Sequence, residues 1–148
     1  MKRRLLFCLA VISGLVLAFD RPTTTDSSAD LKEVLLGYFN GIKTFDTVKM
    51  KNLCTADVTI YEEGKEYNND SVFRDMRGIF PYKADFRFEH FQIFVDKNSG
   101  FMSYYENAKF AFWDTVRLDL SFLGSAAFRK EQGVWKMCLL HSTLRYER

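Results

Sequence analysis

The segment Gly133–Ser142, with the sequence GVWKMCLLHS, decides the fold. Successive side chains of a β-strand point to opposite faces, so Trp135, Met137 and His141 are expected on one face. The other face is also apolar near its middle, at Leu140. A strand that is apolar on both faces is usually covered on both. The segment therefore predicts a central strand with helices on one side and a second copy of the chain on the other. A monomer that exposes the second face is the alternative.

The second half of the chain reads as β-structure around this strand. Apolar and polar residues alternate over residues 84–95, 101–113, 116–130 and 134–146, a pattern that predicts four long strands. The apolar phase of the first strand flips after His90, which indicates a β-bulge. Residues 96–100 are expected to form the hairpin loop between the first two of these strands. Gly124 is expected to bend the third.

The first half of the chain reads mainly as helix. An apolar stripe with helical spacing runs from Leu31 to Ile42 and predicts the first helix. A short second helix is expected from Thr44 or Asp46 to Leu53. Val58–Glu62 is β-branched and predicts a strand, with a short returning strand over 65–68. Asn69 or Asp70 is expected to cap a third helix, which ends at Gly78.

Two stretches and the order of these elements carry a resemblance to a known family. Leu53–Tyr61 resembles the junction of second helix and first strand in the NTF2-like (cystatin-like α+β roll) superfamily, in particular its SnoaL-like and DUF4440-type branch. Gly133–Ser142 is similar to the closing strand of that family. The resemblance implies an α+β half-cone, with three helices packed on a strongly curved, mostly antiparallel sheet in the order ααββαββββ. It also implies a conical pocket and often a dimer built on the outer sheet face.

The N-terminal segment is predicted to be a cleavable export signal, residues 1–18. Lys2, Arg3 and Arg4 precede an apolar run of about 15 residues, shorter than the roughly 20 needed to span a bilayer. Residues 19–28 are polar and are expected to form a flexible tether, so the domain covers 29–148. The short basic start is typical of bacterial signals. The expected location is therefore periplasmic or secreted, without membrane attachment after cleavage.

Composition excludes several functions. Without the first 18 residues the chain carries 18 Lys and Arg against 19 Asp and Glu, so nothing favours nucleic acid. Phosphate loops, zinc motifs and serine-hydrolase motifs are absent from the sequence, and two histidines cannot build a His-rich metal site. No metal and no cofactor are expected. Cys54 and Cys138 read as buried thiols, with a disulfide as the alternative in an oxidising compartment.

Aromatic residues make up 16% of the chain and are expected to line the pocket or fill the core. If they line a pocket, its ligand is a small hydrophobic or aromatic molecule held by a few polar groups. Arg117 and Arg129 could pair a ligand carboxylate. The predicted pocket residues are Tyr38, Tyr61, Tyr104, Phe112, Trp113, Trp135 and Met137.

Two residues are candidates for catalysis, Glu62 and His141. His141 shares the predicted inward face with Trp135 and could move a proton near neutral pH. The resemblance implies a role for Glu62, because the ketosteroid isomerase branch carries a carboxylate base at the matching point of its first strand. Glu62 also reads as part of a solvated turn. The helix position that would carry an oxyanion-binding tyrosine falls near Leu35, with Tyr38 one turn away.

Three hypotheses for function follow. The first is an exported domain that binds a small hydrophobic or aromatic molecule as a homodimer. The second is a cofactor-independent isomerase, cyclase or dehydratase with Glu62 or His141 as general base. The third is an accessory domain with a filled cone that acts through its outer sheet face. A fold of this kind hosts all three, so the geometry of the site must separate them.

Overall fold

The computed structural model describes residues 27–113 and 115–146. The predicted signal peptide, residues 1–18, lies outside this part of the chain, as does most of the predicted tether 19–28. The elements follow the predicted order: α1 (Ser27–Thr44), α2 (Thr47–Asn52), β1 (Cys54–Glu62), β2 (Lys65–Tyr67), α3 (Asn69–Ile79), β3 (Tyr82–Val95), β4 (Ser99–Phe112), β5 (Val116–Glu131) and β6 (Val134–Leu144).

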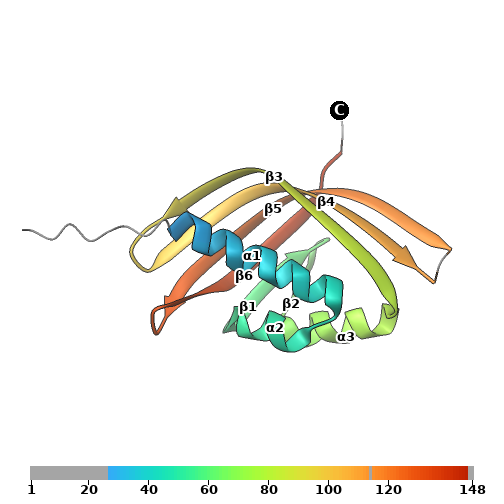
Figure 1. The fold of residues 1–148 in the computed structure, drawn as a ribbon, viewed down its shortest axis with the longest axis horizontal. Helices are drawn as coiled ribbons and strands as arrows, with labels where there is room; N and C mark the ends of the chain where they lie inside the picture. The colour runs from blue at the N-terminus through green and yellow to red at the C-terminus, as the bar shows by residue number, and fades with distance from the viewer. Residues whose placement is uncertain (1–26, 114, 147–148) are drawn as a thin grey trace, which may run out of the picture.

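The strands form one curved sheet in the order β2-β1-β6-β5-β4-β3. The strand that closes the sequence, β6, pairs parallel with β1 and antiparallel with β5, so it lies inside the sheet as predicted. The other neighbours are antiparallel. The helices gather on one side of this unclosed sheet (Figure 1). The predicted α+β half-cone is therefore confirmed.

Helix α1 lies across the sheet because its apolar stripe faces the strands. Leu31, Leu35 and Tyr38 are almost fully buried. Helix α2 is capped by Asp46, whose carboxylate accepts a hydrogen bond from the Lys49 amide at 2.9 Å. None of the helices in the described part is long and apolar enough to cross a membrane.

Helix α3 starts one residue earlier than the sequence predicted. Its cap is Asn68, not Asn69 or Asp70. The Asn68 side chain accepts from the Ser71 amide, and the Ser71 hydroxyl accepts from the Asn68 amide, both at 2.9 Å. This reciprocal pair satisfies two donors at the start of the helix.

The predicted bulge in β3 is confirmed. The register with β4 shifts between Glu89 and Gln92, and His90 has a positive φ of 54°. The extra residue lets both Phe88 and Phe91 face the helices, where their ring centroids lie 6.4 Å apart. The bulge thus bends the strand toward the helical layer and keeps its apolar residues inside.

A second bulge, in β6, overturns one expectation from the sequence. The register with β5 shifts at Phe128, which pairs with Met137 while Ala127 pairs with Leu139. Cys138 is the additional residue. Trp135 and Met137 face the core, but beyond the bulge the inward residues are Leu140 and Ser142. The prediction that His141 points inward with Trp135 is wrong, because the inserted residue reverses the phase.

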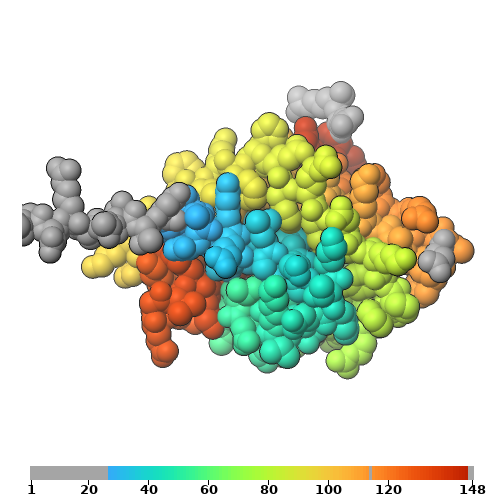
Figure 2. All heavy atoms as spheres, viewed as in Figure 1, coloured from blue at the N-terminus to red at the C-terminus, as the bar shows by residue number. Residues whose placement is uncertain are grey.

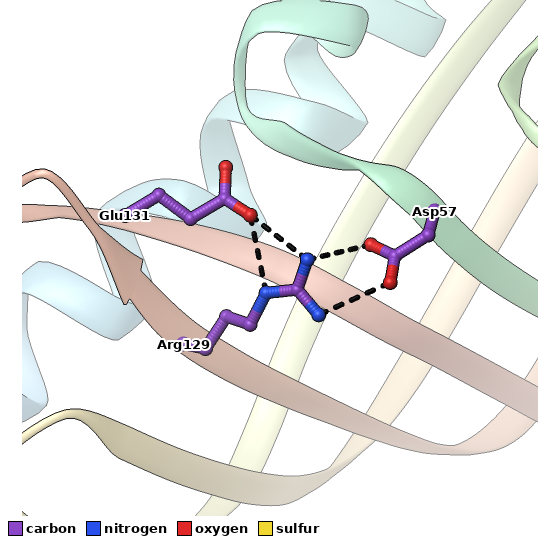
Figure 3. Close-up of polar contacts among 3 residues, drawn as sticks. All are labelled: Asp57, Arg129 and Glu131. Atoms are coloured by element: carbon purple, nitrogen blue, oxygen red, sulfur yellow. Dashed lines mark hydrogen bonds and ion pairs between the residues drawn. The ribbon is translucent and has the colours of Figure 1, made fainter.

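The outer sheet face carries a branched ion pair next to this bulge (Figure 3). The Arg129 guanidinium of β5 donates to both carboxylate oxygens of Asp57 in β1, at 2.7 and 3.1 Å. It also donates to Glu131 at 2.8 Å. The Arg129 side chain reaches across β6, which lies between β5 and β1, and so links these two strands. The link lies where the pairing of β6 with each of them shifts register. Cys54 and Cys138 are free thiols.

Candidate functional site

A cavity of about 280 Å³ lies between the concave sheet face and the helices. Its walls come from helices α1 and α3 and from all six strands. Most of its lining is apolar, and a few acidic and hydroxyl side chains interrupt it. The lining residues are Tyr38, Phe39, Ile42, Ile60, Glu62, Tyr67, Val72, Asp75, Met76, Ile79, Tyr82, Phe86, Glu106, Phe110, Phe122, Leu140 and Ser142.

Glu106 is the most unusual residue of this cavity. It belongs to β4 and shares its inward face with Tyr104 and Ala108, and only 4% of its surface is exposed. Its Oε2 has no hydrogen-bond partner among the described residues. Burial raises the pKa of its carboxyl to about 8, and the nearby charge of Glu62 adds to the rise. At neutral pH Glu106 is mainly protonated and can donate a hydrogen bond.

Two tyrosine hydroxyls accompany Glu106. The hydroxyls of Tyr38 and Tyr104 are buried and lack partners in the described part of the chain. Burial raises the pKa of each, and Glu62 adds to both shifts while Glu106 adds to that of Tyr104. The Tyr104 ring fits against Gly124 of β5, where a Cβ would overlap it. Both phenols therefore stay protonated, and the hydroxyl of Tyr38, which lines the cavity, is a further donor there.

Glu62 lies at the rim of the cavity. It ends β1 and stands beside Ser142 of β6, and both residues line the cavity. Its side chain keeps contact with solvent. The surrounding protein still removes enough water to raise the pKa of the carboxyl, and the like charge of Glu63 adds to this. Glu62 can thus act as a proton acceptor beside donors contributed by other elements.

Only some of the predicted site residues line the cavity. Glu62 and Tyr38 line the cavity, whereas Tyr104 is buried in the core, where the charge of Glu106 adds to the rise of its pKa. Tyr61 and His141 form a cross-strand pair on the opposite face, with ring centroids 6.4 Å apart. Since Glu62 and Tyr61 are neighbours in one strand, only one of them can point inward.

The other predicted pocket residues lie in the core or outside the cavity. Trp135 and Met137 are buried in the main hydrophobic core. Phe112 is partly buried beyond the end of the cavity, and Trp113 is exposed at the tip of the β4–β5 hairpin. Arg117 and Arg129, considered as anchors for a carboxylate, lie on the outer face, as their alternation with inward Leu118 and Phe128 requires.

The residues Glu106, Tyr82 and Ser142 were not identified from the sequence. Tyr82 forms part of one wall, and its hydroxyl has a hydrogen-bond partner because it donates to the Ile42 carbonyl at 2.6 Å. A signal for Glu106 was present. It alternates with Met102, Tyr104 and Ala108 on the apolar face of its strand, a position where an acid is rare.

The donor set of the cavity fits neither a metal nor an anion. Among residues 27–113 and 115–146, no three His, Cys, Asp or Glu side chains are grouped as metal ligands would be. The side chains that line the cavity include acids but no Lys, Arg or His. The arrangement can donate hydrogen bonds to an oxygen atom of a neutral molecule and can accept a proton at Glu62.

Comparison with known proteins shows the fold and leaves the activity open. No family model and no curated protein sequence matches the chain. A hexachlorocyclohexane dehydrochlorinase (LinA type 2) is 13% identical, with a TM-score of 0.70 over 81% of this chain and 86% of that chain. A proposed dehydratase of the NTF2-like family from Streptomyces avermitilis is 14% identical, with a TM-score of 0.69 over 82% and 97%.

A third solved structure has a different kind of role. The association domain of CaMKII from C. elegans is 15% identical, with a TM-score of 0.64 over 78% of this chain and 93% of that chain. The chain therefore has the NTF2-like, or cystatin-like, fold, as the resemblance implied. The similar structures range from named enzymes to an association domain, so the site must carry the argument for function.

Proposed function

We propose that the cavity binds a small, largely apolar molecule that carries a carbonyl or similar neutral oxygen. The observation that carries this proposal is the buried, unpartnered carboxyl of Glu106 in an otherwise apolar wall. A buried polar group without a partner is costly, and native proteins nearly always satisfy it. A ligand oxygen placed between Glu106 and Tyr38 would accept from both and relieve that cost.

The charge of the cavity selects against anionic ligands. Glu62 and Asp75 line it, and its lining contains no basic side chain. A carboxylate or phosphate would meet like charge without compensation. The volume of about 280 Å³ also speaks against a cone filled by its own aromatic residues, the third hypothesis from the sequence.

Binding has a direct test in the pH dependence of affinity. We would measure the dissociation constant of heptanone by calorimetry between about pH 6 and about pH 9.5. A neutral ketone has no charge to titrate, so affinity should fall about tenfold as Glu106 loses its proton near pH 8. Glu106→Gln keeps a donor but does not titrate, so its affinity should stay constant with pH. Glu106→Leu should bind weakly at every pH.

The matched control is Glu66→Gln, which removes an exposed carboxylate from β2. It should leave both the affinity and its pH dependence unchanged. Equal affinity of the wild type and Glu106→Leu at pH 6.5 (about thirty protonated molecules per ionised one) would show that Glu106 does not hold the ligand.

A second candidate function is catalysis of proton transfer next to that oxygen, as in an isomerase or dehydratase. The specific observation is that two carboxyls of different character converge on one cavity. Glu106 is protonated and can, with Tyr38, stabilise a developing enolate. Glu62 is at the rim and can accept the proton from carbon. Two of the similar structures carry the names dehydrochlorinase and dehydratase, which supports this class.

Catalysis can be tested without knowing the substrate. Exchange of the α-protons of heptanone for deuterium, followed by NMR, reports proton abstraction directly. The wild type should accelerate exchange, Glu62→Gln should lose at least tenfold of the acceleration, and Glu66→Gln should retain it. If the ketone binds but its α-proton exchange is not accelerated, the protein binds the ligand and does not catalyse proton transfer.

Export and dimerisation complete the proposal. The outer sheet face exposes Phe94, Phe101 and Leu123, and the first two rings stack 4.7 Å apart. This supports a homodimer that covers this face. Sedimentation of the mature chain should give twice the monomer mass, and Phe101→Asp should give the monomer. Fractionation of cells that express the full sequence should place the product outside the cytoplasm, shortened by the first 18 residues.

A further inference from the structure

The floor of the cavity continues beyond the helices as a strip of apolar side chains. Glu106 and Phe110 line the cavity from β4, and Phe112 follows on the same face two residues later. Their partners on β5 continue the strip, since Phe110 stands opposite Leu118 and Phe112 opposite Val116. We call Phe110, Phe112, Val116 and Leu118 the apolar strip.

Ring contacts join the strip to the cavity wall. Phe86 and Phe110 both line the cavity, with centroids 5.7 Å apart. Phe110 stacks on Phe112 at 5.8 Å with the rings nearly parallel, and Tyr82 contacts Phe112 at 6.2 Å. The surface is therefore continuous from the buried carboxyl of Glu106 to the hairpin.

The far part of the strip is open to solvent. The β4–β5 hairpin projects past the helical layer (Figures 1 and 2). Val116 and Leu118 are 44% and 43% exposed although they face the cavity side of the sheet. The opposite face of the same hairpin is charged, and Lys109 pairs with Asp119 there at 3.2 Å. The hairpin is thus amphipathic, with its apolar face aligned with the cavity.

From this continuity we infer that the ligand is elongated, with its oxygen-bearing head between Glu106 and Tyr38 and an apolar tail along the apolar strip. The inference rests on the proposed binding function and extends it to a substrate class, neutral molecules with one polar end and a chain. From Glu106 to Phe112 the strand advances about 20 Å, longer than a compact molecule that fills the cavity. The tail covers side chains that water otherwise contacts.

The test is a chain-length series of methyl ketones from butanone to tridecanone, titrated at about pH 6.5. The affinity of the wild type should continue to rise roughly two- to fourfold for each added methylene after the cavity is full, the gain for half to full burial. Leu118→Gln should flatten the series for the long ketones, with a loss of about tenfold, and leave the short ketones unchanged. Leu118 is solvent-exposed, so this variant should fold.

Val48→Gln is the matched control. Val48 belongs to helix α2 and is 69% exposed, and it lies neither on the outer sheet face nor in the cavity or the apolar strip. It should behave as the wild type at every chain length. The proposed position of the tail is wrong if affinity stops rising once the cavity is full, or if the two substitutions have equal effects. Either result leaves the binding of the oxygen between Glu106 and Tyr38 in place.

Two further outcomes separate the possibilities. If no ketone of any length binds, the proposed function fails, and the tail path fails with it. If Leu118→Gln converts a dimer into a monomer by light scattering and the series stays unchanged, a second copy of the chain occupies the strip, and the tail path is wrong.

Discussion

The carboxyl of Glu106 should make the stability of this protein depend on pH, and Glu106→Gln should remove that dependence. The substitution keeps the size and polarity of the side chain but takes away its ionisation. Glu106 is 4% exposed, so solvent screens it little. Any group whose pKa differs between the folded and unfolded states links proton binding to unfolding.

The sign and size follow from the two pKa values. In the unfolded chain the carboxyl titrates near 4.5, and in the folded protein near 8. Between these values the folded state binds more protons than the unfolded state, so the free energy of unfolding falls as pH rises, by about 1.4 kcal/mol per pH unit. Below about pH 4 both states are protonated and the penalty is absent. Above about pH 9 it is complete, about 5 kcal/mol, a large share of a typical unfolding free energy.

Urea denaturation of the wild type and of Glu106→Gln, from about pH 5 to about pH 9, measures this contribution of Glu106 to the free energy of unfolding. The difference between the two unfolding free energies should grow with pH in favour of the variant, by several kcal/mol over the range. The exposed-carboxylate variant Glu66→Gln should differ from the wild type by less than about 0.5 kcal/mol. A difference between wild type and Glu106→Gln that stays constant with pH would refute the reasoning, because it would mean that Glu106 is ionised normally.

Three further outcomes are expected. Gly124→Ala should destabilise the protein by about 1–3 kcal/mol in urea denaturation, because the added methyl overlaps the Tyr104 ring. Arg129 lowers the pKa of Asp57, so the pair stabilises the fold above about pH 4 and loses this effect as pH falls through the lowered pKa. The stability difference between the wild type and Arg129→Met should therefore shrink in acid. Burial raises the pKa of Cys54 to about 12, so iodoacetamide should label it slowly in buffer and rapidly in urea, as mass spectrometry of the peptide would show.

The fold was predictable because its decisive features are periodic. The apolar stripe of α1 and the alternation in the long strands specify both the elements and their buried faces. The bulge at His90 was visible because alternation on its two sides runs out of phase. The bulge at Cys138 was invisible for the opposite reason. Met137, Cys138, Leu139 and Leu140 are all apolar, so an inserted residue leaves no trace in the pattern.

That hidden bulge explains why His141 was predicted on the wrong face. A shift of one residue moves every later side chain to the other face. Ser142 therefore lines the cavity, and His141 lies on the opposite face. Glu62 was placed through the resemblance, and Tyr38 through the helical stripe, and both line the cavity. Glu106 was not identified from the sequence, although it alternates with Tyr104 and Ala108 on the apolar face of its strand.

The polar groups of the cavity that lack hydrogen-bond partners are expected to contribute to ligand binding and not to the stability of the fold. Glu106 Oε2 and the Tyr38 hydroxyl stay unsatisfied among the described residues, and neither is tied to a neighbour that it could hold in place. If they were structural, their removal should destabilise the protein. We expect the reverse for the double variant Glu106→Leu/Tyr38→Phe, which replaces both by apolar groups of similar size and should unfold at a higher urea concentration at about pH 8. The same variant should lose ketone binding, so stability and binding move in opposite directions. A lower urea midpoint would show instead that these two groups support the fold.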